Sequence, residues 1–178
     1  IFLPFLPMLP IQVLTNNLLY DFSQTTIPTD NVDAEYLLEP RRWEINNLLR
    51  FMLFIGPISS IFDYATYGKM LFVFNTWNNP SLFQTDWFVE SLLTQTLIIH
   101  IIRTNMIPFI QSRSSWQLSM TTILIMCVGA ILPYSPLAPI LHFVPLPWQF
   151  WPILAVTLLC YISLTQLIKS WLVRKSWV

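Results

Sequence analysis

Five long apolar stretches alternate with polar ones along the chain. They span about residues 5–27, 48–74, 87–107, 116–132 and 148–167. A helix rises about 1.5 Å per residue, so about 20 apolar residues cross the roughly 30 Å hydrocarbon core of a bilayer. The pattern therefore predicts an all-α fold for residues 1–178, a polytopic integral membrane helix bundle of about five transmembrane helices.

The polar stretches predict the connections. Residues 28–44 are too charged for lipid and predict a polar loop, and residues 75–86 predict a short turn rich in Asn and Pro. Residues 108–115 predict a polar connection, and residues 133–147 predict a proline-rich loop. Three prolines predict irregular backbone before the first helix: Pro4, Pro7 and Pro10. Three basic residues predict a short tail after the last helix: Lys169, Arg174 and Lys175.

The composition supports a membrane setting. Hydrophobic residues make up 54% of the chain and charged residues 10%, and the mean hydropathy is +0.57. A soluble domain carries about 25% charged residues, so the lipid bilayer is the expected partner and nucleic acid is not. Cys127 and Cys160 lie inside apolar stretches and are expected to be buried small hydrophobes. The chain begins at Ile1 without a signal-peptide pattern, so we expect it to be a piece of a longer protein.

The basic residues predict the orientation, because Lys and Arg concentrate in the cytoplasmic loops of membrane proteins. With five alternating spans, most basic residues fall on one side of the membrane: those of 41–50, those of 103–113 and those of the tail. Only Lys69 lies toward the other side. We therefore expect the N-terminus outside and the C-terminus in the cytoplasm. The eight tryptophans lie near predicted span ends or in the tail, as an aromatic belt would place them.

The first apolar stretch contains the strongest candidate for a functional site. Asn17 and Asp21 are four residues apart, so a helix places them on one face with Tyr20 beside them. A charged side chain in the middle of a membrane helix costs about 2.5–3.5 kcal/mol, which favours a functional site facing the protein interior. The alternative is a short span in which Asp21 caps the helix at the membrane interface.

Two further carboxylates lie inside predicted spans, with a single lysine near a span edge. The interior is therefore net acidic, and oxygen donors favour a hard cation such as Mg²⁺. Asp63, with Ser59 and Ser60 one turn before it, is either a ligand or a structural residue held by helix-to-helix hydrogen bonds. Glu90 either lies on the path of the ion or anchors its helix at the interface. We interpret His100 as a polar interface residue rather than a proton relay.

Several motifs together resemble one family. The segment PIQVLTNNLLYD at 10–21 resembles the sixth membrane helix of P-type cation-transporting ATPases, in which an Asn-x-x-x-Asp pair ligates the transported ion. Four further segments are similar to the bacterial magnesium-transporting branch: SQTTIPTDNVD at 23–33, FIGPISSIFD at 54–63, QTLIIHIIRT at 95–104 and IPFIQSR at 107–113. The resemblance covers essentially the whole chain and implies that the five spans are the sixth to tenth helices of the C-terminal transmembrane domain.

The resemblance implies a function for the chain. It would be the membrane-embedded ion-binding and translocation half of an ATP-driven Mg²⁺ transporter in the bacterial cell membrane. The implied metal-site residues are Asn17 and Asp21, with weaker candidates Tyr20, Gln95, Glu90 and Asp63. The family's phosphorylation motif and nucleotide domain do not occur in this sequence, so no catalytic residue is assigned. ATP would bind only the complete protein, whose other helices and soluble domains would be the partners.

A second hypothesis is a free-standing truncated membrane protein that acts as a scaffold or partner subunit without transport. The reading frame upstream of Ile1 separates the two, because a frame that encodes the phosphorylation motif favours the pump. In a pump, the loop 28–44 is expected to touch the phosphorylation domain. Its charged residues would then form a docking surface, unless the loop is merely solvated: Asp30, Asp33, Glu35, Arg41 and Arg42.

Overall fold

The computed structural model describes residues 3–31, 45–104 and 112–174. These ranges contain no strand and five long helices: α1 (Pro10–Gln24), α3 (Ile45–Gly68), α4 (Pro80–Ile102), α5 (Trp116–Ile131) and α6 (Phe150–Arg174). Short helical turns adjoin them: the 3-10 turns η1 (Ile27–Thr29), η3 (Thr76–Asn78) and η4 (Leu132–Tyr134), and the π-helical η2 (Lys69–Val73). The predicted all-α helix bundle is confirmed.

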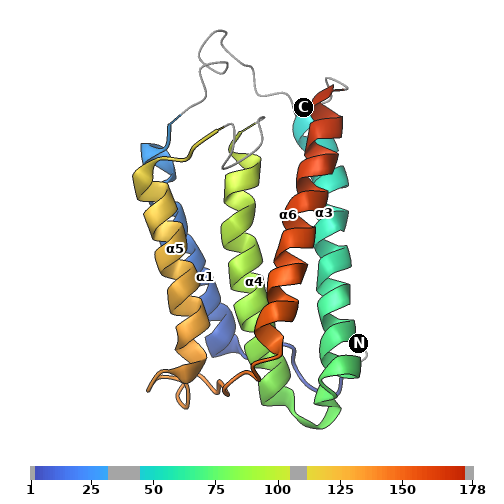
Figure 1. The fold of residues 1–178 in the computed structure, drawn as a ribbon, viewed down its shortest axis with the longest axis vertical. Coiled ribbons are helices and arrows are strands. Elements are labelled where there is room, and N and C mark those ends of the chain that lie inside the picture. Colours follow the sequence, from blue (N-terminus) through green and yellow to red (C-terminus); the bar gives the residue numbers. More distant parts are fainter. Residues whose placement is uncertain (1–2, 32–44, 105–111, 175–178) are drawn as a thin grey trace.

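The helix α4 lies in the middle of the bundle (Figure 1). On one side α1 and α5 pack against each other and against α4, and on the other side α6 packs against both α4 and α3. All five helices run roughly along the long axis, so their connections gather at two ends. We call these the lower end, with residues 69–79 and 132–149, and the upper end, where α1, α4 and α6 terminate (Figure 1).

The start of α4 differs from the sequence prediction. The helix begins at Pro80, so the predicted turn at 75–86 is wrong for its second half. Asn79 accepts a hydrogen bond from the Leu82 amide at 3.3 Å, and proline is well suited to the first helical position. Three polar residues that suggested a solvated turn are instead buried in the first turns of α4: Gln84, Thr85 and Asp86.

Buried amide side chains hold the irregular backbone at the lower end. Gln84 Nε2 donates to the Leu6 carbonyl at 2.8 Å, and Gln12 Nε2 donates to the Leu141 carbonyl at 3.0 Å. These carbonyls lie outside the helices, so a side-chain donor satisfies them where neither water nor lipid would. The irregular backbone before α1 and the loop after α5 agree with the predictions from proline.

The main apolar core surrounds α4. Phe88 and Leu92 of α4 are fully buried and belong to one cluster with Phe143 of the loop and Phe150 of α6. On the opposite side, Gly129 of α5 faces Leu92 so closely that a Cβ atom at Gly129 would clash with the leucine side chain. A glycine at this point allows α5 to approach α4, as small residues do in membrane bundles.

Two helical stretches in the described ranges are long and apolar enough to cross a membrane by themselves. They are Trp116–Tyr134, with 19 residues, and Phe150–Arg174, with 25 residues. The helix α1 is shorter, at 15 residues, and α3 and α4 carry the polar and charged side chains described below. For these three helices, a membrane crossing stays a prediction from the sequence pattern.

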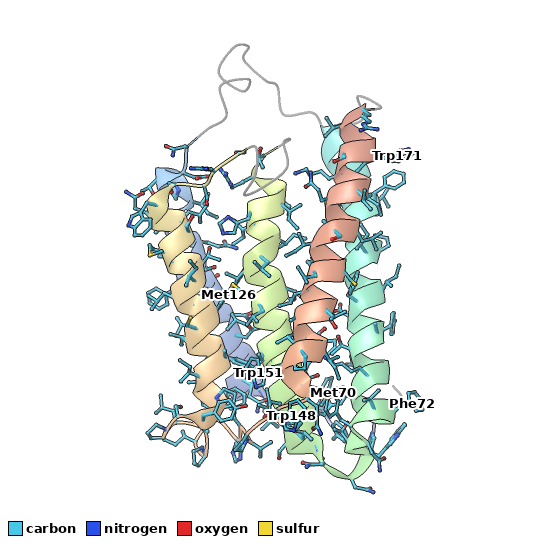
Figure 2. The ribbon with its side chains drawn as sticks, in the orientation of Figure 1. Met70, Phe72, Met126, Trp148, Trp151 and Trp171 are labelled. Carbon is cyan, nitrogen blue, oxygen red and sulfur yellow. The ribbon has the colours of Figure 1, made fainter. Side chains whose placement is uncertain are left out.

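The surface of the bundle carries many large apolar side chains. Figure 2 shows Trp148 and Trp151 at the lower end and Trp171 at the upper end, an arrangement that fits two aromatic belts. Cys127 and Cys160 are exposed on this surface, so the prediction that they are buried is wrong. Positions that face lipid are as apolar as positions that face the core. An apolar stretch in the sequence therefore does not show which of its residues are buried.

The upper end is held by a charged network around Asp30. Asp30 Oδ2 lies 2.6 Å from Arg103 Nη1 of α4, and Asp30 Oδ1 accepts from the Ser115 amide before α5 at 2.7 Å. Asp30 thus connects the segments that follow α1 and α4 to the start of α5. It is a structural residue rather than part of a free docking surface. The other charges of the predicted docking surface, within 33–42, lie outside the described residues.

Lys169 is also part of the upper end and does not belong to a tail. The helix α6 continues to Arg174, and Lys169 is only 3% exposed. Its ammonium donates to the carbonyls of Ile101 and Thr104, at 2.6 Å each. Carbonyls at a helix C-terminus lack partners within the helix and carry its negative partial charge, which explains why a buried lysine is stable here. The predicted basic tail is wrong for this residue.

Candidate functional site

The two main candidates lie on the exposed face of α1. Asn17 and Asp21 are both exposed in this bundle, and Tyr20 between them is half-buried against the main core. The buried side chains of α1 are Gln12, Asn16 and Ser23. The expectation that Asp21 faces an interior is therefore not met within the described part of this chain. Its assignment as an ion ligand stays a prediction.

The inward amide of α1 is Asn16, which sequence reasoning did not single out. Its Nδ2 donates to Ser91 Oγ of α4 at 3.3 Å, and Gln95 Nε2 donates to the same hydroxyl at 3.0 Å. Asn16 Oδ1 is buried without a hydrogen-bond partner. The weaker candidate Gln95 therefore takes part in a polar contact between α1 and α4, adjacent to the core.

Three of the weaker candidates meet at one cavity. A cavity of about 300 Å³ lies between α3, α4 and α6, and Asp63, Glu90 and Gln95 all line it. Other oxygen-bearing side chains line the same space: Ser59, Thr66, Ser91, Thr94 and Tyr161. The sequence did not predict this convergence, because Asp63 belongs to one predicted span and the other two to the next.

Asp63 is exposed and lies at the cavity without help from its neighbouring serines. The Ser59 hydroxyl pairs with the Tyr161 hydroxyl at 3.2 Å, and the Ser60 hydroxyl donates to the Gly56 carbonyl at 3.5 Å. These two serines therefore do not hold the Asp63 carboxylate. Asp63 remains a carboxylate available at the cavity lining.

Glu90 is buried in an ion cluster at the lower part of the cavity. Its Oε2 lies 2.5 Å from Lys69 Nζ of η2, and its Oε1 accepts a hydrogen bond from the Thr66 hydroxyl of α3. The same ammonium lies 3.4 Å from Asp86 Oδ1. Glu90 thus connects α4 to α3, and Lys69, which directly follows α3, is its ion-pair partner.

Sequence reasoning missed Asp86 because it placed this residue in a turn. Asp86 and Glu90 are four residues apart, and that spacing on a helix could have indicated a shared face. The pairing with Lys69 could not have been inferred in the same way, since it joins two helices. The cluster is next to a π-helical segment, a local distortion that often accompanies functional positions.

His100 behaves as the interface residue that the sequence predicts. It is buried, and its Nε2 lies 2.8 Å from the Thr122 hydroxyl of α5. The contact joins α4 to α5 across the core.

No group of three or more His, Cys, Asp or Glu residues that could hold a metal ion occurs among the described residues.

Comparison with known proteins gives a consistent result. The family model described as "Cation transporting ATPase, C-terminus" matches residues 5–171. Over 176 residues, 98% of this chain, it is 53% identical to "Magnesium-transporting ATPase, P-type 1" from Salmonella typhimurium strain LT2 and to the protein of that name from Escherichia coli strain K12. A further Salmonella typhimurium protein of that name is 47% identical. The chain spans about a fifth of the length of these relatives, 20% or 19%.

Proposed function

Because this chain belongs to the family of C-terminal regions of cation-transporting ATPases, we propose that it forms the membrane-embedded ion-binding half of an ATP-driven Mg²⁺ transporter. Asn17 and Asp21 of α1 contribute to the cation site in this proposal. ATP binds and is hydrolysed in parts of the complete pump that precede this chain. The names of the relatives, all magnesium-transporting ATPases, support Mg²⁺ as the transported ion.

One observation carries the proposal: a carboxylate and an amide, Asp21 and Asn17, lie on an exposed face of α1 that is otherwise mainly apolar. The exposed side chains around Asp21 include Leu14, Leu18 and Phe22, which are 67%, 54% and 56% exposed. A carboxylate that faces lipid costs up to about 2.5–3.5 kcal/mol, the value for the centre of a membrane helix. The cost disappears if another part of the pump covers this face and a cation binds there.

The donor set fits half of a Mg²⁺ site. Mg²⁺ prefers six oxygen ligands and keeps several waters, so it binds through one or two carboxylates with neutral oxygens. Asp21 supplies the carboxylate and Asn17, one turn earlier on the same face, supplies an amide oxygen. The remaining ligands would come from the helices that cover this face in the complete pump.

The proposed orientation has the C-terminus in the cytoplasm, within the bacterial cell membrane. Lys69 was the exception to the charge asymmetry, since it lies toward the opposite side from the other basic residues. In the structure this lysine is paired with two buried carboxylates. A neutralised lysine of this kind does not weigh against an orientation that depends on basic residues in loops.

Substitution in the complete pump tests the ion site. Asp21→Asn keeps the shape of the side chain and removes its charge, so Mg²⁺-dependent growth should be lost while the protein remains at normal abundance in the membrane. Asn17→Ala should give a milder loss, because it removes a neutral ligand. Leu18→Ala is the matched control and should keep growth, since it changes an exposed side chain on the same face of α1 without removing a charge. Full growth with Asp21→Asn would exclude the role.

A free-standing membrane protein without transport is the second candidate. It is favoured by the closed core that α1, α4, α5, α6 and their connections form among themselves. Sequencing of the DNA upstream of Ile1 separates the two functions. A continuous frame that encodes a phosphorylation motif supports the pump, and a start codon without that frame supports the second candidate.

A further inference from the structure

Lys69 is a largely buried lysine that contacts two buried carboxylates. Its Nζ lies 2.5 Å from Glu90 Oε2 and 3.4 Å from Asp86 Oδ1, and 5.0 Å from the centre of the Phe150 ring. The three charged side chains are exposed by 9% or less. Burial of one such ion costs several kcal/mol, so each charge here depends on the others for compensation.

The charges in this cluster are not balanced one to one. Asp86 and Glu90 supply two carboxylates, and Lys69 supplies one ammonium. The second carboxylate oxygen of Asp86, Oδ2, is fully buried without a hydrogen-bond partner. The cluster therefore contains more oxygen acceptors than its lysine satisfies, which is the condition that favours a cation with several coordination positions.

We propose that Lys69 is the resident cation of an oxygen site between α3 and α4, where its ammonium occupies the position that a divalent metal ion would otherwise take. The oxygens that contact the ammonium come from Asp86 and Glu90, and the Thr66 hydroxyl donates to the other carboxylate oxygen of Glu90. Two carboxylates with a hydroxyl beside them suit a hard ion such as Mg²⁺. Helix spacing assembles them, because Thr66 is three residues from Lys69 and Asp86 is four residues from Glu90.

Lys69 lies outside the cavity but binds a carboxylate that lines it, and this affects how the cavity could hold an ion. Glu90 and Thr66 line the cavity between α3, α4 and α6, and Lys69 does not. The ammonium therefore binds, from outside the cavity, a carboxylate that could otherwise ligate an ion inside it. Lys69 prevents Mg²⁺ from being trapped at this point. This role is separate from that of Asn17 and Asp21, which lie on the exposed face of α1.

Removal of the ammonium should create a new metal site. In the purified complete pump, Lys69→Ser removes the charge, leaves space and adds a hydroxyl. Mn²⁺ is the probe, because its bound and free forms are distinguished by electron paramagnetic resonance. We expect Lys69→Ser to bind about one more Mn²⁺ per pump than the wild type, since the vacated position retains two carboxylates. The triple variant Lys69→Ser/Asp86→Asn/Glu90→Gln, which lacks both carboxylates, should return to the wild-type number.

Two further variants make the result decisive. Arg174→Ser removes an exposed cation from α6 and should leave the Mn²⁺ number unchanged. Lys69→Ser/Asp86→Asn keeps the net charge of the wild-type cluster, so it decides the matter if Lys69→Ser does not fold. Its unfolding temperature should then rise with Mn²⁺ by more than that of the wild type. The absence of added Mn²⁺ binding in Lys69→Ser, or of that rise where only the double variant folds, overturns the proposal without bearing on Asp21.

Discussion

The contact between Lys169 and the end of α4 offers the sharpest test of how the bundle is held together. We consider Lys169→Met, which keeps a long unbranched side chain and removes the ammonium. The wild-type nitrogen donates to the Ile101 and Thr104 carbonyls at 2.6 Å each, in a position that is 3% exposed. The substitution therefore leaves two carbonyls without their donor at a buried helix end.

The expected magnitude follows from the two hydrogen bonds that are lost. A hydrogen bond to a charged group contributes about 1.5–3 kcal/mol net of desolvation, so the loss of two costs at least about 3 kcal/mol. About 1.4 kcal/mol changes an opening equilibrium tenfold. We expect the last turn of α4 to open roughly 100-fold more often.

Hydrogen–deuterium exchange of the complete pump measures this opening directly. Amide exchange in a peptide that covers the end of α4 should accelerate about 100-fold in Lys169→Met, because local opening controls exchange. Arg174→Met is the matched control: it removes an exposed cation from the same helix and should leave that peptide unchanged. Equal exchange in Lys169→Met and the wild type would refute the idea that the ammonium stabilises this helix end.

Three further predictions concern packing, charge and orientation. Gly129→Ala should destabilise the complete pump by about 1–3 kcal/mol, since the added Cβ forces Leu92 to move; an unchanged unfolding temperature would show that Leu92 relaxes freely. Asp30→Asn should cost about 3 kcal/mol, because it breaks a largely buried pair with Arg103; denaturant unfolding of the solubilised pump measures this, and a stable variant would contradict it. A cysteine added after Lys175 should resist an impermeant thiol reagent applied to intact cells, and rapid labelling there would reverse the proposed orientation.

The sequence alone determined the order of the helical elements, and it placed the limits of α5 closely but most other helix ends several residues away. Apolar stretches of about 20 residues have few folded alternatives in a membrane, because a helix satisfies its own backbone hydrogen bonds. The same argument gave the irregular start before Pro10 and the loop after α5, where prolines interrupt those bonds. It failed for α4, since the buried polar residues that follow Pro80 looked like a solvated turn.

The tertiary structure decided which side of each helix faces the interior. Asn16 and Asn17 are adjacent amides in one helix, yet Asn16 is buried against Ser91 and Asn17 is exposed. In a membrane helix both faces are apolar, so the pattern of apolar positions does not distinguish lipid from core. The cluster of Lys69 with Glu90 could not be predicted from the sequence for a related reason. A charged pair between two helices depends on which helices become neighbours, and only the packing of the whole bundle determines that.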